Sequence, residues 1–205
     1  FLMFNPYYHG LIRKYIVAFG TLFNNIYINR VNSQGKFIQT MKVPLSYGPK
    51  EKFLSRTDGD PNLDRPFGMV LPRMAFEMTG MRYANDRKLA TTKKHSVVVN
   101  RLNEEQNKYV YNPVPYDMDF TLYINVKNAE DGTKIVEQIL PFFTPDFTTT
   151  LKLIPEMNVE MDIPTVMNTV TQEDTYTGDF TARQAIIWTI DFTIKGYIYG
   201  PVKKA

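Results

Sequence analysis

The chain has 205 residues, of which 43% are hydrophobic and 22% are charged, a balance typical of one globular domain with a substantial core. It contains no cysteine, which excludes disulfides and thiol chemistry, and no apolar run of about 18 residues, which excludes a membrane-spanning helix. The net charge of +3 is low for a nucleic-acid-binding protein unless the basic residues cluster.

Aromatic residues and methionine are the unusual part of the composition. The chain has 13 Tyr, 14 Phe and 10 Met, but one Trp. These side chains are enriched in the centres of protein interfaces, and they also fill cores. Composition therefore predicts either an associating surface or a Phe-rich core with Tyr on the strand faces.

A helix and a hairpin are predicted first. Apolar residues recur at helical spacing at Tyr8, Leu11, Ile12, Tyr15, Ile16 and Phe19. Gly20 and Asn24-Asn25 are expected to end this helix. Residues 26–30 and 36–45 flank the turn Asn32-Ser-Gln-Gly35, which predicts a β-hairpin.

The middle of the chain is predicted to alternate loops with strands. Pro49 is suited to the first turn of a short helix over residues 50–54, and residues 56–67 are polar and rich in turn formers. Residues 70–83 are predicted to form a strand, and residues 85–94 a charged connection. The clearest alternation runs over residues 118–126, with Asp119, Thr121, Tyr123, Asn125 and Lys127 facing outward.

The last third of the chain predicts one helix and two strands. Thr133 is expected to cap a helix whose Ile135, Val136, Ile139 and Leu140 face inward. A strand is predicted over residues 157–163, an exposed acidic loop over residues 171–179, and a final strand from Ile186 to Ile194. Gly196 interrupts the alternation, which predicts a bulge or bend.

Strands interrupted by about three helices, without a repeating strand–helix–strand pattern, predict an α+β fold with a mostly antiparallel twisted sheet. We expect residues 1–205 to form one domain.

Phosphate-binding glycine loops, nucleophile motifs and metal-ligand spacings are absent, so we predict no catalytic, cofactor or metal residues. Asp58, Asp60, Asn62 and Asp64 resemble half a calcium loop, but Leu63 and Met69 occupy two essential positions. Glu104-Glu105 lies in a hydrophilic stretch, where we expect both carboxylates to be solvated.

Basic residues concentrate between Arg82 and Arg101. Three interpretations stay open: a solvated loop, a segment that follows nucleic-acid phosphates, and a contact with an acidic partner surface. The positions of these basic residues in the folded protein would have to decide among the three interpretations.

Several segments in the right order resemble the tail sheath stabiliser and completion proteins of T-even-type contractile-tailed bacteriophages. They are residues 4–28, 36–38, 43–53, 70–74, 135–141 and 188–202. The resemblance implies a structural virion protein with a phage tail-terminator-like fold and no enzyme activity. It also implies assembly in the host cytoplasm and a final position at the top of the tail, at the head-tail junction.

The same resemblance implies a homo-oligomeric ring, a hexamer, that caps the tail sheath and the tail-tube terminator and docks to neck proteins. The alternative is a basic connector of the head-tail junction that contacts DNA non-specifically in its lumen. No membrane contact is expected. Candidate interface residues are the N-terminal Phe4, Tyr7 and Tyr8; the basic Arg87, Lys88, Lys93 and Lys94; and the C-terminal Tyr197 and Tyr199. For each aromatic residue, core packing is the competing interpretation.

Overall fold

The computed structural model describes residues 6–32, 34–50, 71–98, 107–177 and 182–204. Its elements are α1 (Leu11–Phe23), β1 (Tyr27–Val31), β2 (Phe37–Lys42), β3 (Leu45–Tyr47), β4 (Arg73–Tyr83), β5 (Lys94–Val98), β6 (Asn107–Tyr111), β7 (Val114–Val126), α3 (Ala129–Ile139), β8 (Asp146–Ile154), β9 (Val159–Thr177), β10 (Ala182–Ile198) and β11 (Lys203–Lys204). Short 3-10 turns lie at Asn85–Arg87, Leu140–Phe142 and Pro155–Met157.

The main sheet has six strands in the order β3-β4-β7-β10-β9-β8. All its pairs are antiparallel except β3 with β4. The expected α+β fold with a mostly antiparallel sheet is therefore confirmed. The described residues contain two α-helices, and most of the third predicted helix, together with the loop over residues 56–67 and the calcium-like run, lies outside them.

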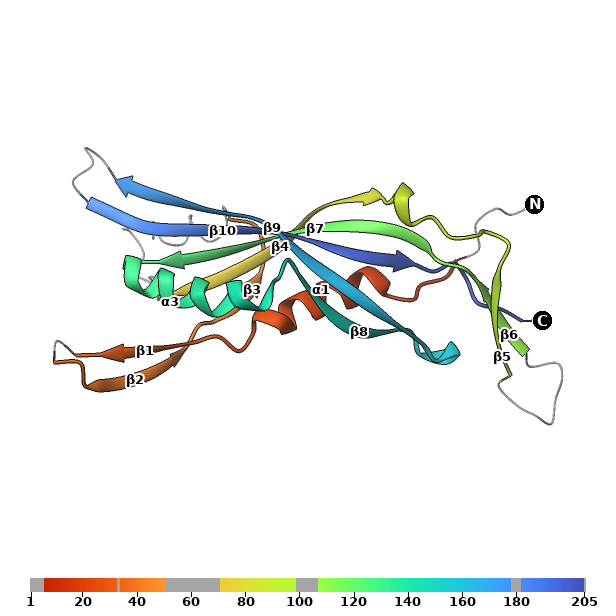
Figure 1. Cartoon of the computed structure of the whole chain (residues 1–205), viewed down its shortest axis with the longest axis horizontal. Coiled ribbons are helices and arrows are strands. Elements are labelled where there is room, and N and C mark those ends of the chain that lie inside the picture. The colour runs from red at the N-terminus through yellow and green to blue at the C-terminus, as the bar shows by residue number, and fades with distance from the viewer. Residues whose placement is uncertain (1–5, 33, 51–70, 99–106, 178–181, 205) are drawn as a thin grey trace, which may run out of the picture.

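One face of the main sheet carries the core. Both helices lie on the same side of this sheet (Figure 1). Helix α1 buries Leu11, Tyr15, Phe19 and Phe23 at intervals of one turn, as its apolar periodicity predicts. The Phe19 ring is fully buried and contacts the rings of Phe23, Phe76, Phe120 and Phe192. Helix α1 continues through Gly20, where a Cβ would lie 2.9 Å from the Phe76 ring. Glycine there allows close packing and does not end the helix.

On the second face of the main sheet, the predicted exposure of the β7 side chains is wrong. Thr121, Tyr123 and Asn125 of β7 were expected to face solvent, but all three are buried. Strand β7 is central, with β4 on one side and β10 on the other. Polar neighbours on those strands contact its side chains. The Thr121 hydroxyl donates to Asp191 at 2.8 Å, and the Tyr123 hydroxyl donates to Glu77 at 2.9 Å, so burial leaves neither hydroxyl without a partner. The buried side-chain oxygen of Asn125, in contrast, accepts no hydrogen bond in the described structure.

Three local predictions are wrong: a helix cap, a loop and a bulge. Helix α3 begins after Asn128, and Thr133 lies inside it, donating to the carbonyl oxygen of Glu130 at 2.9 Å. Residues 171–177 are not a loop but the end of β9, paired with β10. Gly196 causes no bulge, because β10 pairs with β7 in unbroken register from Ile186 to Ile198.

The packing around Gly196 explains its presence in the strand. A Cβ at this position would lie 3.0 Å from Tyr15 Cζ and 3.0 Å from Met118 Cε. Glycine therefore lets α1 approach the sheet.

Two small sheets extend from the main sheet at opposite ends of the molecule (Figure 1). The ribbon formed by β1 and β2 confirms the predicted hairpin. Gly35, at φ 75°, closes its turn by donating its N–H to the Asn32 carbonyl oxygen at 2.9 Å. Both chain termini lie near the second small sheet, whose strand order is β11-β6-β5. Strands β5, β6 and β8 were not predicted.

Candidate interface surfaces

The structure brings several predicted interface residues to one end of the molecule. The N-terminal segment lies beside the C-terminal one, since His9 Nε2 is 2.9 Å from the Gly200 carbonyl oxygen. Tyr8 is 82% exposed and Tyr7 is half exposed, so both can reach a partner. Tyr199, in contrast, is only 6% exposed and donates its hydroxyl to the Met161 sulfur at 3.4 Å. Tyr199 is a core residue. Phe4 lies outside the described residues.

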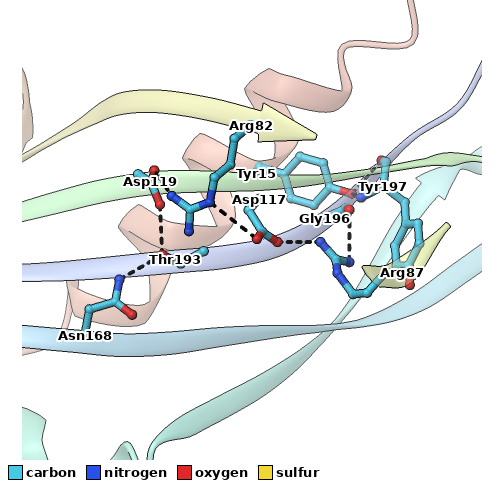
Figure 2. Close-up of polar contacts among 9 residues, drawn as sticks. All are labelled: Tyr15, Arg82, Arg87, Asp117, Asp119, Asn168, Thr193, Gly196 and Tyr197. Carbon is cyan, nitrogen blue, oxygen red and sulfur yellow. Dashed lines mark hydrogen bonds and ion pairs between the residues drawn. The ribbon is translucent and has the colours of Figure 1, made fainter. Parts of the chain in front are cut away.

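Arg87 is partly buried and contacts other residues of its own chain. Its guanidinium donates to the Asp117 carboxylate at 2.6 Å and to the Gly196 carbonyl oxygen at 3.4 Å, as Figure 2 shows. Its Cζ also lies 5.1 Å from the centre of the Tyr197 ring, within the range of a cation–π contact. Arg87 and Tyr197 therefore form a fixed pair that ties the segment after β4 to the end of β10.

A polar network continues from this pair along the second face of the sheet (Figure 2). Arg82 contacts Asp117 at 3.6 Å and Asp119 at 2.7 Å. The Thr193 hydroxyl donates to Asp119 at 2.8 Å and accepts from the Asn168 side-chain amide at 2.8 Å. Four strands, β4, β7, β9 and β10, contribute to the network. Because these polar groups bind one another across four strands, we assign the network a structural role.

Burial raises the pKa of two tyrosines on the core side. It raises the pKa of Tyr15 to about 12, although the backbone hydrogen bond with Tyr197 acts in the opposite direction. It also raises the pKa of the Tyr199 hydroxyl, with the neighbouring Tyr197 adding to the effect. Both hydroxyls therefore stay protonated at neutral pH and act as hydrogen-bonding groups.

The remaining predicted basic residues, Lys88, Lys93 and Lys94, are exposed. Lys94 begins β5, and its Nζ lies 4.6 Å from the centre of the Tyr109 ring and 5.3 Å from that of Tyr111. Loop residues 88–93 run beside the end of β6, since Asn112 N donates to the Lys93 carbonyl oxygen at 3.0 Å. In this connection, the Arg87 side chain is therefore partly buried, whereas the three lysine side chains are exposed.

The β1–β2 ribbon is a second exposed surface, and sequence reasoning did not select it. Phe37 and Ile38 on β2 are 58% and 62% exposed, and Tyr27 and Val31 on β1 are about half exposed. On its inner side, β1 is attached to α3, whose Gln138 side-chain amide donates to the Tyr27 carbonyl oxygen at 2.8 Å. Consecutive apolar residues in the predicted β2 could have revealed this surface, because a two-stranded ribbon cannot bury both of its faces.

Two apolar grooves border α1. One lies between α1 and β8, with Val17, Leu22 and Leu151 in its lining. The other lies between the end of α1 and the turn after α3, and includes Phe142, which is largely exposed. Exposed apolar surface of this kind often marks contact sites.

Neither groove gathers chemical groups suited to a reaction. Within the described ranges, no three acidic or histidine side chains come close enough to hold a metal ion. None of the helices in those ranges is both long and apolar enough to cross a membrane.

Comparison with known protein families places the chain among structural proteins of phage tails. The model of the T4-like virus Myoviridae tail sheath stabiliser matches residues 6–205. The chain is also 30% identical, over 213 aligned positions, to the tail completion protein gp15 of Enterobacteria phage T4, covering 99% of this chain and 75% of that protein. The chain therefore belongs to the T4-like tail sheath stabiliser family, which confirms the resemblance seen in the sequence.

Proposed function

We propose that the chain forms a hexameric ring at the top of the tail, where it caps and stabilises the tail sheath and the tube end and docks the tail to the neck. The observation that carries this proposal is the family match over residues 6–205, together with a tail completion protein as a relative. The proposal adds three finer points to the family match: the ring, its six subunits and its position at the head-tail junction.

The surfaces of the subunit support assembly into a ring. A closed ring of identical subunits needs two different complementary faces on each one. The exposed apolar ribbon and the end that carries both termini lie at opposite ends of the molecule (Figure 1), so one subunit can use them without mutual obstruction. Exposed Phe, Tyr and Ile side chains are suitable anchors for such contacts.

Contact with the sheath is proposed to use an open strand edge. Among the strands that the structure describes, β2 pairs only with β1, and its other edge can accept an extended segment by strand addition. Strand β8 also lies at a sheet edge, but Lys14 Nζ donates to its Lys152 and Leu153 carbonyl oxygens at 3.3 and 2.7 Å. Part of that edge is therefore already occupied, which favours β2 for the sheath.

The decisive experiment measures the mass of the purified chain by light scattering after size-exclusion chromatography, alone and with isolated tails. The proposal expects a particle of about six subunits, alone or on the tails. Electron microscopy of the tails should then show the added density at one end. A monomer that leaves the tails unchanged in both conditions would disprove the proposed ring.

One observation favours a second candidate function, that of a DNA-contacting connector. Lysines cluster on and beside the sheet of β11, β6 and β5. Phosphate binding by such a cluster predicts an affinity for duplex DNA that falls steeply with salt concentration. Titration of labelled duplex DNA at two or more salt concentrations tests this function, and undetectable binding at low salt would exclude it.

A further inference from the structure

We propose that the sheet formed by β11, β6 and β5 is a docking surface for a carboxylate-rich segment of another protein. The inference rests on the local geometry of this sheet and needs neither a ring nor a particular stoichiometry. It therefore stands or fails independently of the capping function.

One face of the small sheet carries an ordered group of two lysines and two tyrosines. In the antiparallel register, Lys94 lies opposite Tyr111, and Lys203 lies opposite Tyr109. Residues that are opposite one another share a face, as do residues two apart on one strand. Both lysines therefore stand on the tyrosine face, one from each strand flanking β6. We call these four residues the Lys–Tyr face.

The tyrosine rings hold the two ammonium groups in place. Lys94 Nζ is 4.6 Å from the Tyr109 ring centre, and Lys203 Nζ is 5.5 Å from that of Tyr111. A ring face attracts a cation but accepts no conventional hydrogen bond from it, so the N–H donors remain available to a ligand. Because the side chains are already partly ordered, a partner loses less conformational entropy on binding them.

The charge around this small sheet is unbalanced, and two of its lysines, Lys94 and Lys203, lie on the Lys–Tyr face. The sheet and the residue before β5 carry Lys93, Lys94, Lys108, Lys203 and Lys204. Among these five, only Lys108 forms an ion pair with a described residue, to Glu156 at 3.2 Å. That pair shows that a carboxylate is accommodated beside this sheet. The other four cations have no described carboxylate partner, and a partner's acidic side chains would supply one.

The arrangement favours carboxylates over single-stranded nucleic acid. Single-stranded nucleic acid binds by stacking bases on free aromatic faces, whereas lysines lie over the Tyr109 and Tyr111 rings. Neighbouring strands are about 4.8 Å apart, which places the flanking strands about 10 Å apart. Acidic side chains four residues apart lie on one face of an extended segment and are about 13 Å apart. Flexible lysine side chains can cover the remaining difference, so one short segment can reach both Lys94 and Lys203.

The test uses the full chain and a fluorescent poly-glutamate peptide of about twelve residues, with fluorescence anisotropy read at several salt concentrations. The reporter variant is Lys94→Glu/Lys203→Glu. A matched control is Lys36→Glu/Lys127→Glu, which changes two exposed lysines elsewhere and alters the net charge equally. The reporter is expected to lose about tenfold or more in affinity and the control about twofold or less.

A second reporter guards against misfolding of the small sheet. Lys94→Gln/Lys203→Gln removes both positive charges of the Lys–Tyr face without introducing negative ones, and it should weaken binding with an unchanged unfolding midpoint. Equal losses in the reporter and the control would show that net charge alone attracts the peptide and would overturn the proposal. Tighter binding of a duplex DNA of matched charge, lost in the first reporter, would also overturn it and assign the surface to nucleic acid.

Discussion

The hydroxyl of Tyr15 takes the place of a neighbouring strand for the backbone of Tyr197. It donates to the Tyr197 carbonyl oxygen at 2.8 Å and accepts from the Tyr197 N–H at 2.9 Å. The pairing of β10 with β9 has already ended at Ile194. One side chain of α1 therefore satisfies both backbone groups of a residue 182 positions away, joining the first helix to the last long strand.

Replacement of Tyr15 by phenylalanine removes both of these hydrogen bonds and keeps the ring. We expect Tyr15→Phe to lower the free energy of unfolding by about 1–3 kcal/mol, because two backbone groups lose their partner in a buried site. Urea denaturation measures the change. Tyr47→Phe, at an exposed position, is the control and should change stability by less than about 0.5 kcal/mol. Equal stability of Tyr15→Phe and the wild type would contradict the assigned role.

The same residue predicts a dependence of stability on alkaline pH. Burial raises the pKa of Tyr15 to about 12 from an ordinary value of 10.0. Between these values the folded protein keeps a proton that the unfolded chain releases. Stability from this group is therefore complete below pH 10 and is lost as the pH rises to 12. The full effect is about 2–3 kcal/mol.

Denaturation curves at several pH values from 9 to 12 provide the measurement for this dependence. The difference in stability between the wild type and Tyr15→Phe should shrink steadily across the upper part of this range. A constant difference from pH 9 to 12 would show that Tyr15 ionises as readily in the folded protein as in the unfolded chain.

Gly132 allows α3 to pack against the sheet. A Cβ at this position would lie 2.6 Å from Trp188 Nε1 and 3.0 Å from Val126 Cγ2. Alanine favours a helix by up to about 1 kcal/mol, but we expect the overlap to dominate and Gly132→Ala to destabilise the protein by about 1–2 kcal/mol. Gly80→Ala, where a Cβ meets nothing within 4 Å, should be nearly neutral. Thermal unfolding of both variants compares the two sites.

Arg87 and its neighbour Lys88 should behave differently when truncated. Arg87→Ala removes the contacts with Asp117, Gly196 and Tyr197, and we expect it to cost about 1–3 kcal/mol. Lys88→Ala changes an exposed side chain and should stay within about 0.5 kcal/mol of the wild type. Chemical denaturation measures both variants. If the Arg87→Ala protein were stable but failed to associate, Arg87 would instead be an interface residue.

We expect a variant of the exposed β1–β2 ribbon to weaken assembly without affecting folding. Phe37→Ser/Ile38→Ser replaces two largely exposed apolar residues of β2, so we expect the unfolding midpoint to change little. Association should weaken by about tenfold or more if these side chains anchor a contact. Light scattering and sedimentation with isolated tails provide the readout. Met81→Ser, an exposed apolar position on β4, is a control outside the ribbon and both grooves, and unchanged association of the ribbon variant would exclude the ribbon.

Local patterns predicted the elements that have one buried and one exposed side. The predicted stripe of α1 is confirmed at Leu11, Tyr15 and Phe19, because an amphipathic helix shows its burial in its own sequence. Tyr8, however, precedes the helix, and both Tyr8 and Ile12 are exposed. Strand β4, the hairpin and the final strand followed from alternation and turn residues in the same way. The order of several segments that resemble the family indicated it, and the family match confirms this. The strands β5, β6 and β8 are short or polar, and their patterns did not stand out.

The sequence by itself determined the α+β class, the core helices and strands, and the family, since each depends on local periodicity or on similarity along the chain. Only the tertiary structure decided which aromatic and basic residues are available to a partner. Tyr199 is buried, Arg87 is paired with Asp117, and Phe37 is exposed. The physical reason is that exposure depends on neighbours brought from distant strands, as Tyr15 and Tyr197 show, and no local pattern encodes those neighbours.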